Sequence, residues 1–196
     1  MIDKLGYALC LTLVTLTPLA ADPFRHSSGE LREYHRDWLA ACPDVIDESA
    51  NDYYGFSCFA STGSQQLNSA GLPAYKLTLM RNRLTGEIDI AFTVALDDAE
   101  VDTSGALMVE FGGERAMRFA FPQDLETRYN TINQFYVSDP ERKAALLEQM
   151  QQRNALTLTV PLRGGAKDSQ SVWLSMRGVL ASLDFMAAHA RKVAQY

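Results

Sequence analysis

Apolar and polar residues alternate one by one through the middle of the chain, and this alternation predicts a fold built mainly from β-sheet. Successive side chains of a strand point to opposite faces of its sheet, so each alternating run predicts a strand with one buried face and one face partly in water. The runs that follow this pattern are 75–80, 88–96, 107–111, 117–121, 156–160 and 172–176.

Short segments with glycine lie between several of these runs. Residues 83–86, 112–113 and 164–165 each separate two alternating runs, where a tight turn would connect antiparallel neighbours. We therefore expect β-hairpins at these places. Residues 22–29 are rich in serine, proline and glycine and predict a flexible start, whereas the pattern over 30–42 does not distinguish a helix from a strand.

Two helices are expected in the second half of the chain. The sequence Ser138-Asp-Pro-Glu141 combines a cap residue, a proline in the first turn and a glutamate three residues after the serine, which predicts a helix to about Gln152. A second helix is expected from about Gly178 to Ala194, where apolar residues recur at helical spacing. Glycine suits position 178 because a strand that turns sharply into a helix needs a residue with free φ. The chain is therefore expected to be mostly β with two helices (α+β).

The first 21 residues have the order of a secretory signal peptide. A short charged start with Lys4 precedes an apolar run, and Pro18, Ala20 and Ala21 follow it. We expect cleavage near Ala21, which leaves 22–196 as a single periplasmic or secreted domain. The alternative is a buried N-terminal helix. Neither the short apolar run nor any later segment has the roughly 20 apolar residues of a membrane span, so the mature chain is expected to have no transmembrane span.

The cysteine count fits an oxidising compartment. Cys10 lies in the predicted signal peptide, so the mature chain keeps the pair Cys42 and Cys58. A disulfide is the natural interpretation of an even pair in an exported protein. The alternative is two free thiols or half of a metal site, but the chain has no Cys-x-x-Cys and no nearby histidine pair at ligand spacing.

Charge argues against one class of partner. The formal net charge is −6, and no basic cluster stands out. Binding to nucleic acid depends largely on lysine and arginine at the phosphates, so no nucleic-acid partner is expected.

The sequence offers no convincing reactive centre. His26, His35 and Asp37 are interpreted as solvated polar residues, and His189 as an exposed residue of the last helix. The acidic segment 97–102 lacks the glycine that an EF-hand requires at its sixth position, where Asp102 stands. It predicts a solvated acidic turn, with an irregular calcium site as the alternative. No Gly-x-Ser-x-Gly occurs. We therefore predict no catalytic, cofactor-binding or metal-binding residues and no cofactor.

Aromatic residues gather around the second cysteine of the pair. Tyr53, Tyr54 and Phe56 precede Cys58, and Phe59 follows it. Such a group either forms an exposed recognition patch, since aromatics are enriched at interfaces, or packs around the disulfide. A second group, Tyr129, Phe135 and Tyr136, leaves the same two alternatives open.

Several short motifs, in order along the chain, resemble the invasion-associated locus B (IalB) family. They are Trp38-x-x-x-Cys42 with a nearby second cysteine, the Ser-Asp-Pro-Glu helix start, and a strand that runs into Leu174-Ser-Met-Arg-Gly-Val-Leu-Ala-Ser-Leu183. The resemblance implies a single exported bacterial envelope domain, β-sandwich-like, with a disulfide and a C-terminal helix. It also implies a link to host association or stress adaptation, and it supplies no catalytic residues.

These observations favour a non-enzymatic envelope protein that binds an envelope or host-surface partner. The segment 44–71 is expected to present the contact surface, with Tyr53, Tyr54 and Phe56 as anchors. The alternative is a periplasmic small-ligand carrier, or a hydrolase with a dispersed active site, in a cleft between sheet and helices. A chaperone-like role for exported proteins is a third interpretation.

Overall fold

The computed structural model describes residues 22–44, 57–83, 85–128 and 131–191. The predicted signal peptide, 1–21, and the predicted anchors Tyr53, Tyr54 and Phe56 lie outside the described residues. Neither helix in the described ranges is long and apolar enough to cross a membrane.

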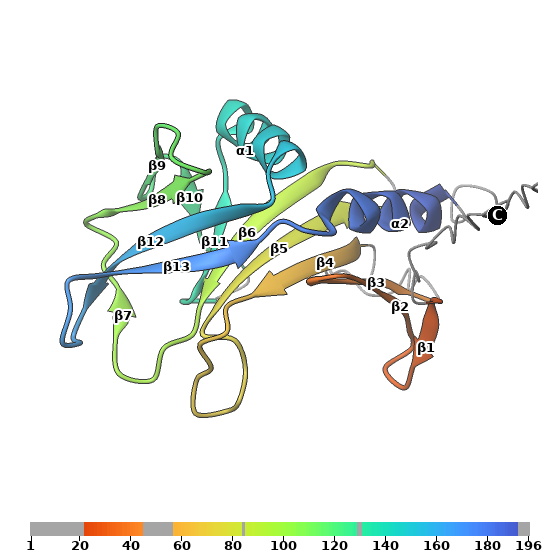
Figure 1. Cartoon of the computed structure of the whole chain (residues 1–196), viewed down its shortest axis with the longest axis horizontal. Helices are drawn as coiled ribbons and strands as arrows, with labels where there is room; N and C mark the ends of the chain where they lie inside the picture. The colour runs from red at the N-terminus through yellow and green to blue at the C-terminus, as the bar shows by residue number, and fades with distance from the viewer. Residues whose placement is uncertain (1–21, 45–56, 84, 129–130, 192–196) are drawn as a thin grey trace, which may run out of the picture.

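Two antiparallel sheets form the fold, as the alternating runs predict (Figure 1). In the large sheet the strands follow the order β1 (Phe24–His26), β2 (Glu30–His35), β3 (Trp38–Pro43), β4 (Ser57–Gly63), β5 (Tyr75–Asn82), β6 (Ile88–Val94), β11 (Gln134–Val137) and β10 (Leu125–Glu126). The small sheet has the order β13 (Ser169–Ser175), β12 (Ala155–Arg163), β8 (Ala106–Glu110) and β9 (Met117–Ala120), and β7 (Glu100–Val101) also pairs with β12.

The expected hairpins are confirmed. The strand pairs β5–β6, β8–β9 and β12–β13 are antiparallel neighbours, and their connections contain the three predicted turns. The large sheet also pairs strands that are distant in the sequence, because β6 lies beside β11.

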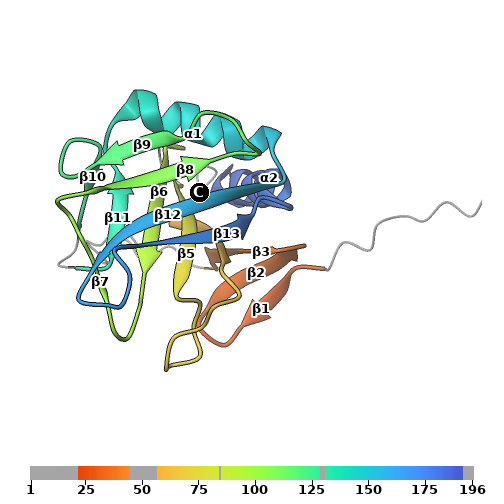
Figure 2. The same cartoon turned by 60° about the vertical axis from the view of Figure 1, so that its left-hand side comes forward.

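One hydrophobic core lies between the sheets and the helices. In Figure 2 the small sheet lies in front of the large sheet. One helix lies above the two sheets, and the other lies behind the small sheet. Side chains from both sheets and both helices share this core, and its largest fully buried members include Trp38, Tyr75, Phe92, Phe119 and Phe135. The described residues therefore form the expected β-sandwich-like domain.

Helix α1 (Pro140–Gln152) begins one residue later than the sequence predicts. The cap is Asp139 rather than Ser138, because the Asp139 carboxylate accepts a hydrogen bond from the backbone N–H of Arg142 at 2.8 Å. A carboxylate at this position also interacts favourably with the positive end of the helix dipole. Proline occupies the first turn, as predicted.

Helix α2 (Val179–Arg191) follows β13 and packs across β2, β3, β4 and β5 of the large sheet. The end of β13, which leads into this helix, is tied to β3 by the Trp38 indole N–H, which donates to the carbonyl of Ser175 at 2.9 Å. The predicted C-terminal helix is thus confirmed for the described residues.

The start of the domain differs from the prediction. Residues 24–26 form strand β1 at the edge of the large sheet instead of a flexible segment. Two contacts hold this edge strand: the Phe24 ring stacks on Tyr34, and Arg25 pairs with Asp44 at 2.7 Å. The ambiguous stretch 30–42 is the β2–β3 hairpin, whose turn passes through Arg36 at a φ of 58°.

Candidate interaction surface

The predicted disulfide joins Cys42 of β3 to Cys58 of β4. The two cysteines are the pair that follows Ala41 and Phe59 in the strand register, and their Cα atoms are 4.2 Å apart. Because β3 and β4 are already neighbours, the bond fixes the two ends of the segment 43–57. This is the segment that carries the three predicted anchors.

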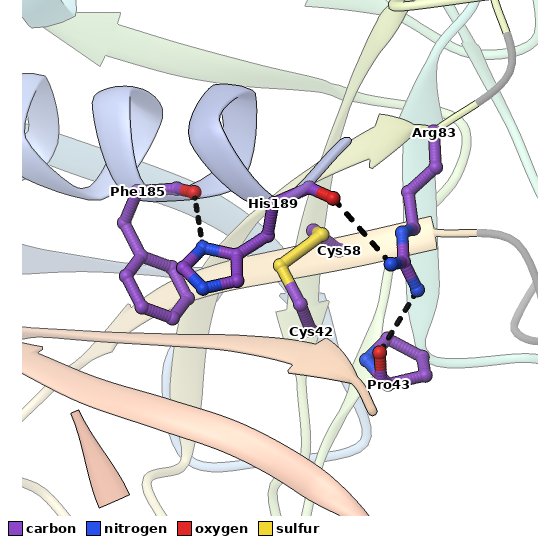
Figure 3. Close-up of a disulfide and its surroundings, with 6 residues drawn as sticks. All are labelled: Cys42, Pro43, Cys58, Arg83, Phe185 and His189. Carbon is purple, nitrogen blue, oxygen red and sulfur yellow. Dashed lines mark hydrogen bonds between the residues drawn. A yellow bond between two sulfur atoms is a disulfide. The ribbon is translucent and has the colours of Figure 1, made fainter. Parts of the chain in front are cut away.

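Arg83 reinforces the same place (Figure 3). Its guanidinium donates to the carbonyl of Pro43 at 2.9 Å and to the carbonyl of His189 at 3.4 Å. Only 8% of Arg83 is exposed, and burial lowers the pKa of its guanidinium. Because the carbonyls at a helix C-terminus carry partial negative charge, the last turn of α2 is a favourable partner for this cation. The β5–β6 hairpin, the end of β3 and the end of α2 therefore meet beside the disulfide.

The three polar residues near the N-terminus that were interpreted as solvated do not come together, and His35 is largely buried rather than solvated. His26 bonds to Ser28 at the exposed edge of the large sheet, whereas the His35 ring lies edge-on to Phe185 under α2 with a centroid distance of 5.8 Å. Asp37 belongs to the turn after β2, so it does not share a strand face with His35, and its carboxylate accepts from the Ser175 hydroxyl at 2.6 Å. These residues serve packing and turn geometry.

His189 also differs from the prediction. The residue is half-buried, its ring lies 4.2 Å from that of Phe185, and Nδ1 is 2.9 Å from the Phe185 carbonyl (Figure 3). The expectation of an exposed residue was wrong because α2 packs across four strands of the large sheet and the His189 ring lies against Phe185.

The acidic segment 97–102 uses its carboxylates within the loops. Asp97 accepts from the backbone N–H and the hydroxyl of Ser69, and Glu100 pairs with Arg163 at 2.9 Å. Among the described residues no three His, Cys, Asp or Glu side chains converge closely enough to hold a metal ion. An open groove of about 820 Å³ runs beside this segment, lined by residues 94–101, 103, 132–133 and 163–164.

The large sheet turns its other face away from the core. We call it the outer face, and one row of paired residues crosses it from strand to strand: Tyr34, Leu39, Ser61, Thr78, Ala91 and Tyr136. Of the second predicted aromatic group, Phe135 faces the core and Tyr136 faces outward, and both are buried. The packing alternative therefore holds for these two residues, and Tyr129 lies outside the described ranges.

An exposed aromatic pair lies at the β1 edge of the outer face. The rings of Phe24 and Tyr34 stack with centroids 6.0 Å apart, and the residues are 40% and 54% exposed. The neighbouring Arg25–Asp44 ion pair places this edge beside the beginning of the segment 43–57. Sequence analysis missed the pair, although Ser27-Ser28-Gly29 between Phe24 and Tyr34 is a usable hairpin signal.

Comparison with known proteins reveals a likeness of fold. No family model matches the chain, and no curated protein matches its sequence. The fold matches the crystal structure of invasion associated protein B from Bartonella henselae with a TM-score of 0.54 and 13% sequence identity, over 82% of this chain and 99% of that chain. The predicted resemblance to the IalB proteins is thus confirmed as a likeness of fold.

Proposed function

We propose that the chain is an exported, non-enzymatic envelope protein that binds an envelope or host-surface partner. The segment 44–71 forms the contact surface, and Tyr53, Tyr54 and Phe56 are its anchors, carried by the stretch 43–57 that the disulfide closes. The exposed Phe24–Tyr34 pair adjoins it. The likeness of fold to a protein named for its association with invasion supports an exported protein linked to host invasion.

The observation that carries this proposal is that two separate contacts fix the ends of the stretch 43–57. The disulfide joins its two ends, and Arg83 holds the Pro43 carbonyl against the end of α2. A recognition segment on a fixed base loses less conformational entropy when it binds. Functional contacts are also commonly carried by segments that a rigid scaffold positions.

The packed interior favours this function over a carrier or a hydrolase that works between sheet and helices. That space is occupied by buried side chains of both sheets, together with Leu146 and Met150 of α1 and Phe185 and Met186 of α2. Ligand sites are usually concave and largely preformed. A ligand in this region would have to displace the core.

The test is crosslinking of a tagged full-length chain in its native envelope, followed by mass spectrometry of the captured proteins. We expect a reproducible partner, and we expect its capture to fall at least tenfold when Tyr53, Tyr54 and Phe56 are replaced by alanine. The melting temperature should stay unchanged. Trp173→Ala is the matched control, because Trp173 is 56% exposed on the small sheet and should leave capture intact.

Three outcomes would contradict the proposal. Capture of nothing by an exported, oxidised chain would argue against a protein partner. A large fall in the melting temperature of the triple variant would show that the three aromatics belong to the core. The intact mass, measured with and without reductant, tests cleavage near Ala21, and a mass that retains residues 1–21 would argue against export.

A further inference from the structure

The open groove of about 820 Å³ lies at the end of the domain opposite α2. Strand β7, which lines it, is on the left of Figure 1, whereas α2 and the disulfide beside it are on the right. Three segments that are distant in the sequence form its walls: residues 94–101 and 103, residues 132–133 between β10 and β11, and residues 163–164 at the β12–β13 turn. None of these described lining residues belongs to the segment 44–71.

The charged side chains that line the groove are mostly acidic. Asp97, Asp98 and Glu100 are negatively charged, and Arg163 is the single cation among the described lining residues, so the groove carries an excess of negative charge. All four residues are exposed. A cleft lined mainly by charges of one sign concentrates ions of the opposite sign. The groove is therefore complementary in charge to a cationic ligand.

The three carboxylates differ in how far the protein already uses them. Asp97 is committed, because it accepts hydrogen bonds from the backbone N–H and the hydroxyl of Ser69. Glu100 pairs with Arg163, but the two side chains are 71% and 63% exposed, and ion pairs at such exposure contribute little to stability. A ligand cation can therefore compete with Arg163 for Glu100.

Asp98 is the carboxylate that is left for a ligand. In the described ranges no basic side chain lies within ion-pair distance of it. Its charge acts on the protein as well as on the solvent, because burial and then the negative charge of Asp98 raise the pKa of the Tyr75 hydroxyl. Tyr75 is the strand partner of Val94, which lines the groove. An ammonium group in the groove would balance this charge.

Accessible apolar side chains line the same groove. Ile132 is 87% exposed, and Leu96 and Ala99 are half-buried against the core. The position of Ile132 is fixed by its neighbour Asn133, whose carbonyl accepts from the backbone N–H of Val94 at 2.9 Å. Covering these side chains removes apolar surface from water, which favours a ligand with an apolar body.

The combination of charge and apolar surface selects one class of ligand. A bare inorganic cation would leave Ile132 uncovered, and a neutral hydrocarbon would leave Asp98 without a counter-charge. We propose that the groove binds a small aliphatic amine, that is, a primary ammonium group on a chain of several methylene groups. The ammonium pairs with Asp98, and the chain lies on Leu96, Ala99 and Ile132. This activity goes beyond partner binding by the segment 44–71 and uses none of its three anchors.

Hexylamine is the first probe, because at neutral pH it carries one ammonium group on a flexible aliphatic chain. We would follow the backbone amide and methyl resonances of the exported, oxidised chain by NMR during titration with hexylamine, 1-hexanol, methylamine and calcium chloride. An ionic strength of about 0.15 M screens non-specific surface attraction. We expect saturable hexylamine shifts centred on residues 96, 98, 99 and 132. 1-Hexanol lacks the charge and methylamine lacks the chain, so each should bind at least tenfold more weakly.

Variants test the two halves of the groove separately. Asp98→Asn should weaken hexylamine binding at least tenfold, and Ile132→Ser should weaken it severalfold. Both residues are exposed, so the melting temperature should stay unchanged. Asp184→Asn is the matched control, because it removes the same charge from an exposed position of α2, outside the groove, and should bind hexylamine normally.

Four results would overturn the proposal. Equal binding of hexylamine and 1-hexanol would show a site for apolar chains rather than amines. Tighter binding of calcium would identify a metal site. Normal binding by Asp98→Asn, or an equal loss in Asp184→Asn, would show attraction to the overall negative charge. Tighter binding of a lysine blocked at both its amino and carboxyl ends would assign the groove to a lysine side chain of a partner protein.

The two proposals fail separately. The triple variant of Tyr53, Tyr54 and Phe56 should bind hexylamine like the natural chain, and Asp98→Asn should still capture the envelope or host-surface partner. Loss of hexylamine binding with intact capture would therefore count against the amine site alone.

Discussion

Gly178 packs directly against the backbone carbonyl of His35, and a Cβ atom at position 178 would overlap the His35 oxygen. This contact joins the start of α2 to the β2–β3 turn. The backbone N–H of Asp37 donates to the carbonyl of Arg177 at 3.3 Å beside it. The residues that lead into α2 are therefore in direct contact with the β2–β3 turn.

Replacement of Gly178 by alanine should destabilise the protein strongly. The φ of Gly178 is 110°, a backbone conformation that residues with a side chain rarely adopt, and the new methyl group would overlap backbone atoms. We expect a loss of about 3 kcal/mol or more in the free energy of unfolding, measured by urea titration. Gly113→Ala is the control, because Gly113 has a φ of 83° but open space around its Cβ position. Its cost should be only about 1–2 kcal/mol, and equal costs would contradict the packing argument.

Removal of the disulfide should also be measurable. The chain-entropy estimate for a bond between residues 16 positions apart is about 3 kcal/mol. The double variant Cys42→Ala, Cys58→Ala should lose about this much stability relative to the oxidised protein in urea titrations. Dithiothreitol should destabilise the natural chain and leave the double variant unchanged. If the fully reduced natural chain had the same free energy of unfolding as the oxidised chain, the prediction would be refuted.

Arg83→Met tests the contact beside the disulfide. The methionine keeps much of the apolar stem but leaves the carbonyls of Pro43 and His189 without the guanidinium donor. Loss of the guanidinium partner of these partly buried carbonyls should cost about 2 kcal/mol in thermal or urea unfolding. Arg25→Met offers the comparison, because the Arg25 side chain is 78% exposed and its ion pair with Asp44 should contribute less than about 1 kcal/mol. A smaller effect at Arg83 than at Arg25 would contradict the structure.

Lys76→Met should raise the stability of the protein at neutral pH. Burial lowers the folded-state pKa of Lys76, whereas the unfolded chain keeps a value near 10.5. The folded state therefore binds the proton less tightly, and this cost is fully present below the folded-state pKa. It declines as the pH rises through that pKa and vanishes above about 10.5. The difference in melting temperature between Lys76→Met and the natural chain should follow this course, and a difference that grows with pH would have the wrong sign.

The strands and helices that carry strong local signals could be predicted from the sequence. Strand β6 shows period-two alternation, and Asp139-Pro140 marks the start of α1 almost to the residue. The β2–β3 hairpin was missed because its turn passes through Arg36, a residue that gives no turn signal. Strand β1 was missed because the contacts that hold it in place are made with Tyr34 and Asp44, which are distant in the sequence.

The position of Lys76 beside Thr78 and Thr93 could not be predicted, although these three residues occupy polar positions of predicted strands. Alternation assigns Lys76, Thr78 and Thr93 to the wetter face of the sheet. Their convergence depends on the register between β5 and β6 and on the long-range pairing of β6 with β11. Neither follows from local periodicity.

The cysteine pair separates what evolution must conserve from what it can vary. Since the Cα atoms of Cys42 and Cys58 stay 4.2 Å apart in paired strands, insertions and exchanges between them leave the register of β3 and β4 unchanged. Longer surface connections also cost little extra entropy once their ends are joined. Sequence changes between the two cysteines should therefore leave the pairing of the large sheet intact.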